Sequence, residues 1–208
     1  SMPASNRILP SWRGLSASLV LACSPLAAEA METPASALAE GIDQLRQTVG
    51  TWNVTTTQYR NDGTIARTVA GTYQFDWVVP DRVVSGRAYI PMLGQMSGIL
   101  FYVNEQRAAL EMAQVDANGQ LTVLSGTAGK ELRSTAPVAA PDGSKVQLRV
   151  TRLNAGPDRF ESRLDVSTDG GTSWRPGQYQ RFVRAKGEAG EAAGLRYRKP
   201  SQTYVPLT

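Results

Sequence analysis

The chain has 208 residues, of which 41% are hydrophobic and 19% are charged, an ordinary balance for one globular domain with a sizeable core. It contains no histidine and a single cysteine, Cys23, which excludes a Ser–His triad, a histidine-ligated haem and a disulfide or cysteine zinc site within one chain. The net charge of +4 is scattered along the sequence and is not clustered with aromatic residues, so the composition does not favour nucleic-acid binding.

Residues 1–30 have the layout of a secretory signal peptide. Arg7 and Arg13 precede a short apolar stretch, Leu15–Leu26, and residues 27–30 read Ala-Ala-Glu-Ala, a cleavage site of small residues. The apolar stretch is too short for a permanent membrane span. We therefore expect residues 1–30 to lie outside the fold and the mature protein to be periplasmic or secreted. An ordinary N-terminal helix is the alternative.

Cys23 gives the leader a second interpretation. Residues 20–23 read Val-Leu-Ala-Cys, which resembles a bacterial lipobox. In that case Cys23 would be lipidated, would become the new N-terminus and would anchor the protein to a membrane. A membrane partner is expected only under this alternative.

A single helix is predicted at residues 34–49. Leu38, Ile42, Leu45 and Val49 recur at helical spacing on one face. Thr33 precedes Pro34 in the arrangement typical of a capped helix start, and Gly50 can end the helix. An amphipathic helix before a β-rich body needs a sheet edge or a barrel mouth to cover.

Strands follow from Gly50 onward. The clearest is residues 69–79, where Tyr73, Phe75 and Trp77 alternate with mostly polar residues, as in a strand that buries one face. Between residues 127 and 140 the pattern is less regular, and one short strand is expected near Glu131–Thr135. Turn signals separate the strands at residues 61–64, 80–81, 104–107, 116–119, 141–143, 156–158 and 169–171.

The spacing of these turns decides the fold class. Strands that recur every 8–15 residues or so through tight turns indicate an antiparallel up-and-down meander, closed as a barrel or stacked as a sandwich. The connections are too short for parallel crossovers. The predicted domain is all-β, covers residues 31–186 and has one N-terminal helix. Residues 187–208 form a tail that is either disordered or anchored by Tyr197 and Tyr204.

Gly50-Thr51-Trp52, placed between the helix and the first strand, resembles the G-x-W start of the lipocalin-like (calycin) barrels. The resemblance covers roughly residues 45–184 and implies a barrel of about 8–10 strands. It also implies that Trp52 closes one end and stacks on a basic side chain of the last strand, Arg181 or Arg184. The chain lacks the disulfides and the late helix of many lipocalins. It looks more like the small bacterial lipocalin-like domains of unassigned function.

Residues 167–174 match the S-x-D-x-G-x-x-W pattern of an Asp-box. Such boxes recur in sialidase-type propellers, in which Ser and Asp bond the backbone of a hairpin and Trp packs below it. A propeller needs several copies, and this chain has one. We therefore interpret the motif as a hairpin and reject glycosidase activity.

The inward side chains predict where a ligand would bind. A barrel of this size either packs solid or holds one small molecule among apolar walls with a few polar groups. Tyr73, Tyr89, Gln114 and Arg87 are candidates for those polar groups, and the loop Pro91–Met96 is a candidate lid. The predicted ligand-contacting residues are Tyr73, Phe75, Trp77, Tyr89, Met96, Phe101, Met112 and Gln114.

Three functions remain open. The first is an exported barrel that binds a small hydrophobic or aromatic molecule without chemistry and without a cofactor or metal. The second is a small barrel enzyme, an isomerase, cyclase or hydrolase, that uses Tyr, Arg or an inward carboxylate; the sequence assigns no catalytic residue. The third is a cell-envelope interaction module that uses the basic tail or the outer sheet face. Oligomeric state stays open.

Overall fold

The computed structural model describes residues 33–186; the predicted leader with Cys23, and the tail from residue 187, lie outside the described residues. The elements are one helix, one 3-10 turn and eleven strands. Their bounds are α1 Pro34–Thr48, β1 Gly50–Tyr59, β2 Ile65–Val79, β3 Val83–Ile90, η1 Pro91–Leu93, β4 Gln95–Asn104, β5 Ala109–Asp116, β6 Leu121–Thr127, β7 Leu132–Ser134, β8 Val138–Ala139, β9 Lys145–Leu153, β10 Arg159–Ser167 and β11 Arg175–Arg184.

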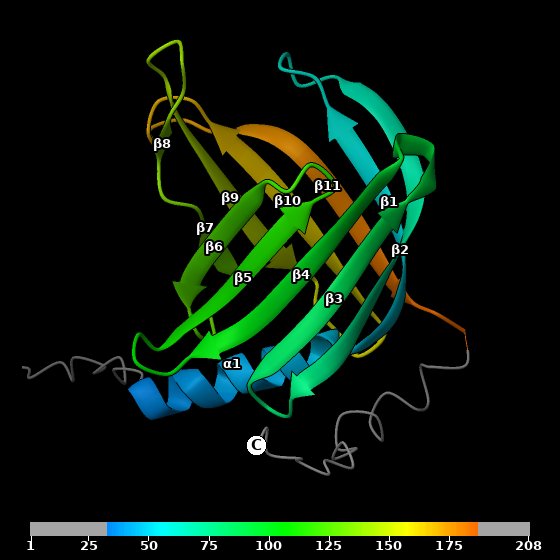
Figure 1. The fold of residues 1–208 in the computed structure, drawn as a ribbon, viewed down its shortest axis with the longest axis vertical. Helices are drawn as coiled ribbons and strands as arrows, with labels where there is room; N and C mark the ends of the chain where they lie inside the picture. Colours follow the sequence, from blue (N-terminus) through cyan, green and yellow to red (C-terminus); the bar gives the residue numbers. More distant parts are fainter. Residues whose placement is uncertain (1–32, 187–208) are drawn as a thin grey trace, which may run out of the picture. The chain divides into compact units, whose positions relative to one another are not determined.

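Ten of the strands form a closed antiparallel barrel (Figure 1). Strands β1 to β7 follow one another around the wall, β9, β10 and β11 continue it, and β11 pairs with β1 to close the ring. Strand β8 pairs only with β9 and stands outside the ring. The predicted all-β meander with one N-terminal helix is confirmed, and the ring settles barrel against sandwich.

Helix α1 covers one end of the barrel, called here the closed end (Figure 1). The Thr33 hydroxyl accepts a hydrogen bond from the Ser36 backbone N–H at 3.3 Å, which caps the helix start. Leu45 is fully buried in the core, and Gly41 faces Ala128 so closely that an added Cβ would lie 2.9 Å from the Ala128 Cβ. Among the described residues, no helix is both long and apolar enough to cross a membrane.

Trp52 and Arg184 lock the closed end. Trp52 is fully buried, its indole N–H donates to the Thr48 carbonyl at 2.8 Å, and the Arg184 guanidinium lies 4.1 Å from its ring centroid. Arg184 donates to the carbonyls of Gln47 at 3.2 Å, Val49 at 2.7 Å and Pro157 at 2.8 Å. The cation therefore sits at the helix C-terminus, where unpaired carbonyls favour positive charge.

Arg181, the other residue proposed for this closure, does not take part. Its side chain is 63% exposed and lies 3.9 Å from Glu161 on the outside of the barrel. It pairs with Thr55 on β1, three residues before Arg184, so the period of two turns the two arginines to opposite faces. The basic side chain that stacks on Trp52 is therefore Arg184 and not Arg181.

The Asp-box forms the β10–β11 hairpin. The Ser167 hydroxyl donates to the Asp169 carboxylate at 2.7 Å and accepts from the Gly171 N–H at 2.8 Å. The same carboxylate accepts from the Ser173 N–H at 2.9 Å and from the Ser173 hydroxyl. The Trp174 indole donates to the Gly171 carbonyl at 3.2 Å. With one copy in a barrel wall, the motif acts as a turn, as the sequence predicts.

Replacing Arg184 tests the closure. We expect Arg184→Met to lower the free energy of unfolding by about 2–5 kcal/mol, because buried carbonyls lose a charged donor. Urea unfolding followed by tryptophan fluorescence measures the change. The matched control is Arg181→Met, three residues away and exposed, for which we expect a change within about 0.5 kcal/mol. Equal effects of the two changes would contradict the assigned role of Arg184.

The hairpin gives a pH dependence. Bonds from the Ser173 hydroxyl and N–H, and then from Ser167, lower the pKa of Asp169 to about 2 from 3.8. A carboxyl group with a lowered pKa stabilises the folded state at pH values above its pKa in the unfolded chain, and this stabilisation is lost as the pH falls toward 2. We expect Asp169→Asn to be less stable than wild type at pH 7 and the gap to shrink between about pH 4 and pH 2. The measurement is denaturant unfolding over this pH range, with Asp76→Asn as the control. A stability difference between Asp169→Asn and wild type that does not change with pH would contradict the assigned role of Asp169.

Candidate functional site

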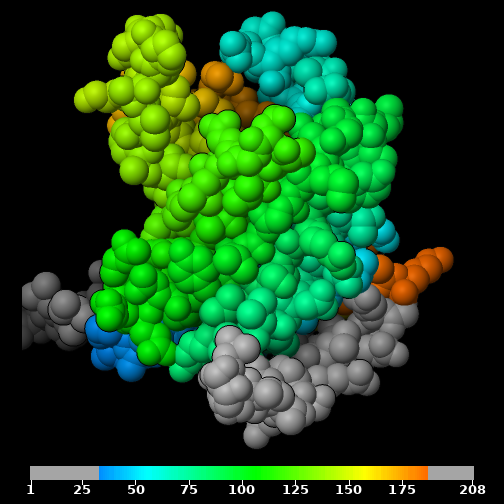
Figure 2. All heavy atoms as spheres, viewed as in Figure 1, coloured from blue at the N-terminus to red at the C-terminus, as the bar shows by residue number. Residues whose placement is uncertain are grey.

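The barrel interior holds a cavity of about 630 Å³ that opens at the end away from α1. Figure 2 shows the surface hollowed at that end, between the hairpin near residue 62 and the hairpin near residue 142. Exposed and half-buried residues of the segments 93–97 and 116–120 form part of the rim. The apolar part of the wall consists of Phe75, Ala88, Ile90, Ile99, Phe101, Met112, Leu124, Leu148, Val150, Phe160, Leu164 and Phe182.

Strand register and small residues shape this wall. Phe101, Met112 and Leu124 are direct cross-strand neighbours on β4, β5 and β6, so they form one continuous band inside the barrel. Gly86 on β3 lies opposite Phe75, and a Cβ there would be 2.5 Å from the Phe75 ring. The absence of a side chain at Gly86 lets the Phe75 ring lie across the neighbouring strand.

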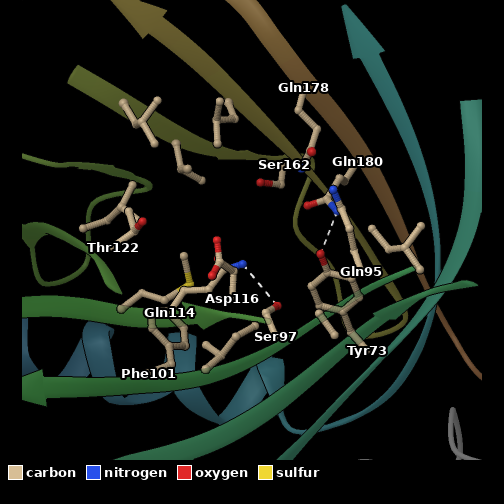
Figure 3. A pocket seen from close by; sticks show the side chains of 18 of the residues that line it. Tyr73, Gln95, Ser97, Phe101, Gln114, Asp116, Thr122, Ser162, Gln178 and Gln180 are labelled. Atoms are coloured by element: carbon tan, nitrogen blue, oxygen red, sulfur yellow. Dashed lines mark hydrogen bonds between the residues drawn. The ribbon is translucent and has the colours of Figure 1, made fainter. Parts of the chain in front are cut away.

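One polar group on the wall is built around Tyr73. The Gln180 amide N–H₂ donates to the Tyr73 hydroxyl at 2.9 Å and to the Thr56 hydroxyl at 3.0 Å, and Tyr73 and Gln180 point toward one another in Figure 3. Burial raises the pKa of Tyr73, with Gln180 opposing the shift, so the phenol is neutral at pH 7. Since its oxygen already accepts from Gln180, the hydroxyl proton is available to a ligand.

Further polar groups lie nearer the opening. The Gln114 amide donates to the Ser97 hydroxyl at 3.2 Å (Figure 3). The Asp116 carboxylate accepts from the backbone N–H groups of Asn118 and Gln120, each at 2.9 Å, and so holds the β5–β6 turn. Within residues 33–186, no group of three Cys, Asp or Glu side chains is placed to hold a metal ion.

Arg152 carries a positive charge on the wall that is neutralised. Its guanidinium donates to the Glu131 carboxylate at 2.7 and 2.9 Å and to the Gln47 amide oxygen at 3.3 Å. Burial alone would raise the pKa of Glu131, but the hydrogen bonds and charge of Arg152 outweigh it and hold this pKa below its ordinary value. The Glu131 carboxyl is therefore ionised at neutral pH.

Arg133 carries a second positive charge, and this one is not neutralised by contact. The residue is 6% exposed, lines the cavity and places its guanidinium 5.0 Å from the Phe101 ring centroid. Within the described part of the chain, no hydrogen bond or ion pair reaches the Arg133 side chain, and its Nε is buried without a partner. Burial, and next the charge of Arg152, lower the pKa of Arg133 to about 10, which leaves it protonated at neutral pH.

The structure brings most of the predicted ligand-contacting residues to one wall. The residues that line the cavity are Tyr73, Phe75, Met96, Phe101, Met112 and Gln114. Trp77 does not line it; the ring packs against the buried core beside the cavity. In the candidate lid, Leu93 and Gly94 lie on the rim, whereas Met92 is 80% exposed and points away.

Tyr89 and Arg87 lie on the outer face, contrary to the expectation that they orient a ligand. Tyr89 is 47% exposed, and the Arg87 guanidinium donates to the Gln74 side chain at 3.0 Å on the exposed surface. The residues of β3 that face inward are Val84, Gly86, Ala88 and Ile90. Small and aliphatic residues set the inward face here, so the aromatic ring of Tyr89 is a misleading marker of burial.

Sequence reasoning missed the polar residues Gln180, Arg152 and Arg133. Each occupies an inward position on its strand, where the alternation with its neighbours was the only available signal. Arg133 lies on β7 within the short strand expected near Glu131–Thr135, with Leu132 before it on the outer face. Because polarity was taken as a sign of exposure, these residues were not assigned to the interior.

Solved structures of similar fold are distant. Rv2717c from M. tuberculosis is 12% identical, with 70% of this chain and 98% of that chain covered and a TM-score of 0.48. The S-type phycobiliprotein lyase CPES from Guillardia theta is 13% identical over 71% and 96% of the two chains, with a TM-score of 0.43. EF1p2_mFAP2b, solved bound to DFHBI, is 16% identical over 70% and 98%, with a TM-score of 0.35.

These likenesses are too weak to indicate the ligand of this chain. No protein-family model matches the sequence, and neither does any curated protein. What the structure itself shows is a closed antiparallel barrel with a helix at one end and the Arg184 guanidinium over the Trp52 ring.

Proposed function

We propose that the barrel binds one small, largely apolar molecule in its interior. The observation that carries the proposal is the cavity of about 630 Å³, which is open at one end and walled mainly by aliphatic and aromatic side chains. Small-molecule sites have volumes of about 300–1,000 Å³ and combine an apolar lining with a few fixed polar groups. Tyr73, Gln180 and Gln114 supply such groups here.

The cavity also bears on the alternatives. A solid core, the other expectation for the interior, is contradicted by the open volume. The enzyme hypothesis asks for an inward Tyr, Arg or carboxylate. On the described cavity wall the acidic side chain is Asp116, whose oxygen already accepts two backbone N–H groups of its turn. The inward tyrosine is Tyr73, and burial raises its pKa, so the phenol stays protonated and supplies no base at neutral pH. Binding without chemistry is the function that this wall supports best.

One observation favours the interaction module as a second candidate. On the outer face, Leu100 and Val123 flank Ala113, while Val115 lies beside Leu121 on the neighbouring strand. The exposed fractions of Leu100, Val115, Leu121 and Val123 run from 42% to 59%. These residues lie on strands β4 to β6, which belong to the green surface turned to the viewer in Figure 2. Adjacent exposed apolar side chains of this kind are typical of a surface that contacts another molecule.

Binding can be tested by filling the cavity. We expect thermal-shift and native mass-spectrometry screens of lipids, quinones and aromatic metabolites to yield ligands that raise the melting temperature, since a ligand at 100 times its Kd stabilises by about 2.7 kcal/mol. Ser162→Trp places a large ring on the cavity wall and is expected to abolish the shift. The control Ser85→Trp adds the same ring to the outer face. Retained binding in Ser162→Trp would contradict the interior site.

We also propose that the protein is exported, on the strength of the charged, apolar and small-residue segments of residues 1–30. We expect intact-mass analysis of the protein from a periplasmic fraction to show an N-terminus near Met31. A lipid-modified Cys23 in the membrane fraction would establish the lipoprotein alternative. Mature protein that retains residues 1–30 in the cytoplasmic fraction would contradict export.

A further inference from the structure

We propose that the ligand is an amphipathic anion whose acidic group binds Arg133 and whose apolar body fills the cavity. This inference rests on the proposed function, because it names the chemical class of molecule that the same cavity takes. A carboxylate on an alkyl or aromatic body is the simplest member of the class.

The first step is that Arg133 is a buried charge without a partner. Only 6% of the residue is exposed, and no hydrogen bond or ion pair from residues 33–186 reaches its side chain. An isolated buried charge is strongly unfavourable, so buried cations in proteins are normally paired. Arg133 lines the cavity, where a bound anion would supply the missing partner.

The second step is that the neighbouring carboxylates are engaged elsewhere. Glu131 is held by two hydrogen bonds from Arg152, at 2.7 and 2.9 Å, and forms no ion pair with Arg133 among the described contacts. Asp116 lies at the opening, bonded to its own turn. With Arg152 and Glu131 cancelling, the described wall near Arg133 retains one positive charge.

The third step is that the surroundings hold the guanidinium ready. Gly126 on the adjacent strand has no side chain, and a Cβ there would lie 2.0 Å from the Leu132 carbonyl oxygen and 3.1 Å from the Arg133 Cγ, so the glycine lets both the backbone of β7 and the arginine stem come close to β6. The guanidinium lies over the Phe101 ring at 5.0 Å. A cation–π contact takes up no N–H donor, so the N–H fork that matches a carboxylate remains for another group.

Matched probe pairs that differ only in the head group test the inference. The pairs are dodecanoate with 1-dodecanol, and 1-pyrenebutyrate with 1-pyrenebutanol, titrated into the full chain at pH 7. We expect the anion of each pair to bind the wild type about tenfold tighter or more, because a hydrogen bond to a charged group is stronger than one between neutral groups. In Arg133→Met, the anion and alcohol should bind with equal affinity, and the alcohol should bind as in wild type.

Two further variants fix the interpretation. Arg67→Met removes an exposed arginine on β2, the same change in net charge, and should leave the preference intact. Arg133→Gln keeps a polar side chain and serves where the methionine variant folds poorly; it should also lose the preference. Without ligand, Arg133→Met should melt at a higher temperature than wild type, since removing an unpaired buried charge relieves its desolvation.

The outcomes separate the two proposals. Equal binding of anion and alcohol by wild type, or a preference that survives in Arg133→Met and Arg133→Gln, would overturn the anionic class while leaving the cavity site standing. Failure of every member of both pairs to bind would overturn the proposed function and this inference with it. Loss of the preference in Arg133→Met and Arg133→Gln, but not in Arg67→Met, would support both.

Discussion

A closed wall of ten strands turns every second side chain toward one shared interior, and this constraint governs the rest of the molecule. The inward side chains of such a wall meet near the axis only where they are large. At the closed end, Trp52, Phe160 and Phe182 fill the section, with ring centroids 4.2 to 6.4 Å apart. Farther along the axis, Ala88, Ser97 and Ser162 are too short to meet, and the cavity results.

Two buried arginines show how the same side chain serves different ends in this barrel. Arg184 has a side chain that is fully buried, and its N–H groups reach the carbonyls of Gln47, Val49 and Pro157. Arg133 is almost as buried and has no such acceptors among the described residues. Buried polar groups that form all their hydrogen bonds make a structure more rigid. A buried polar group without a hydrogen-bond partner is stabilised when a bound molecule supplies one. The difference in hydrogen bonding, and not in burial, therefore distinguishes the closing role of Arg184 from the binding role proposed for Arg133.

Much of the fold could be predicted because it depends on local periodicity. A local conformation is predicted by the helix with its Thr33 cap, by the turn signals and by the alternation around Tyr73 and Phe75. In a meander, most strands pair with the next strand along the chain, so the local elements also predict most of the strand order. It was harder to predict which side chains point into the barrel and which point outward. Tyr89 faces outward although it is aromatic, and Trp77 packs against the core without lining the cavity. Which inward residues reach a cavity depends on the packing of all ten strands and not on local alternation.

The candidate site was harder to predict for a physical reason. Sequence patterns identify inward positions by their apolar residues. A site that orients a ligand places polar groups at inward positions, and these residues break the pattern. On β7 the exception is an inversion: Leu132 is 44% exposed, whereas Arg133 beside it is 6% exposed. Stability alone would favour the opposite order. A strand that exposes leucine and buries an arginine without a partner sacrifices stability, and such sacrifices are concentrated where a protein binds something.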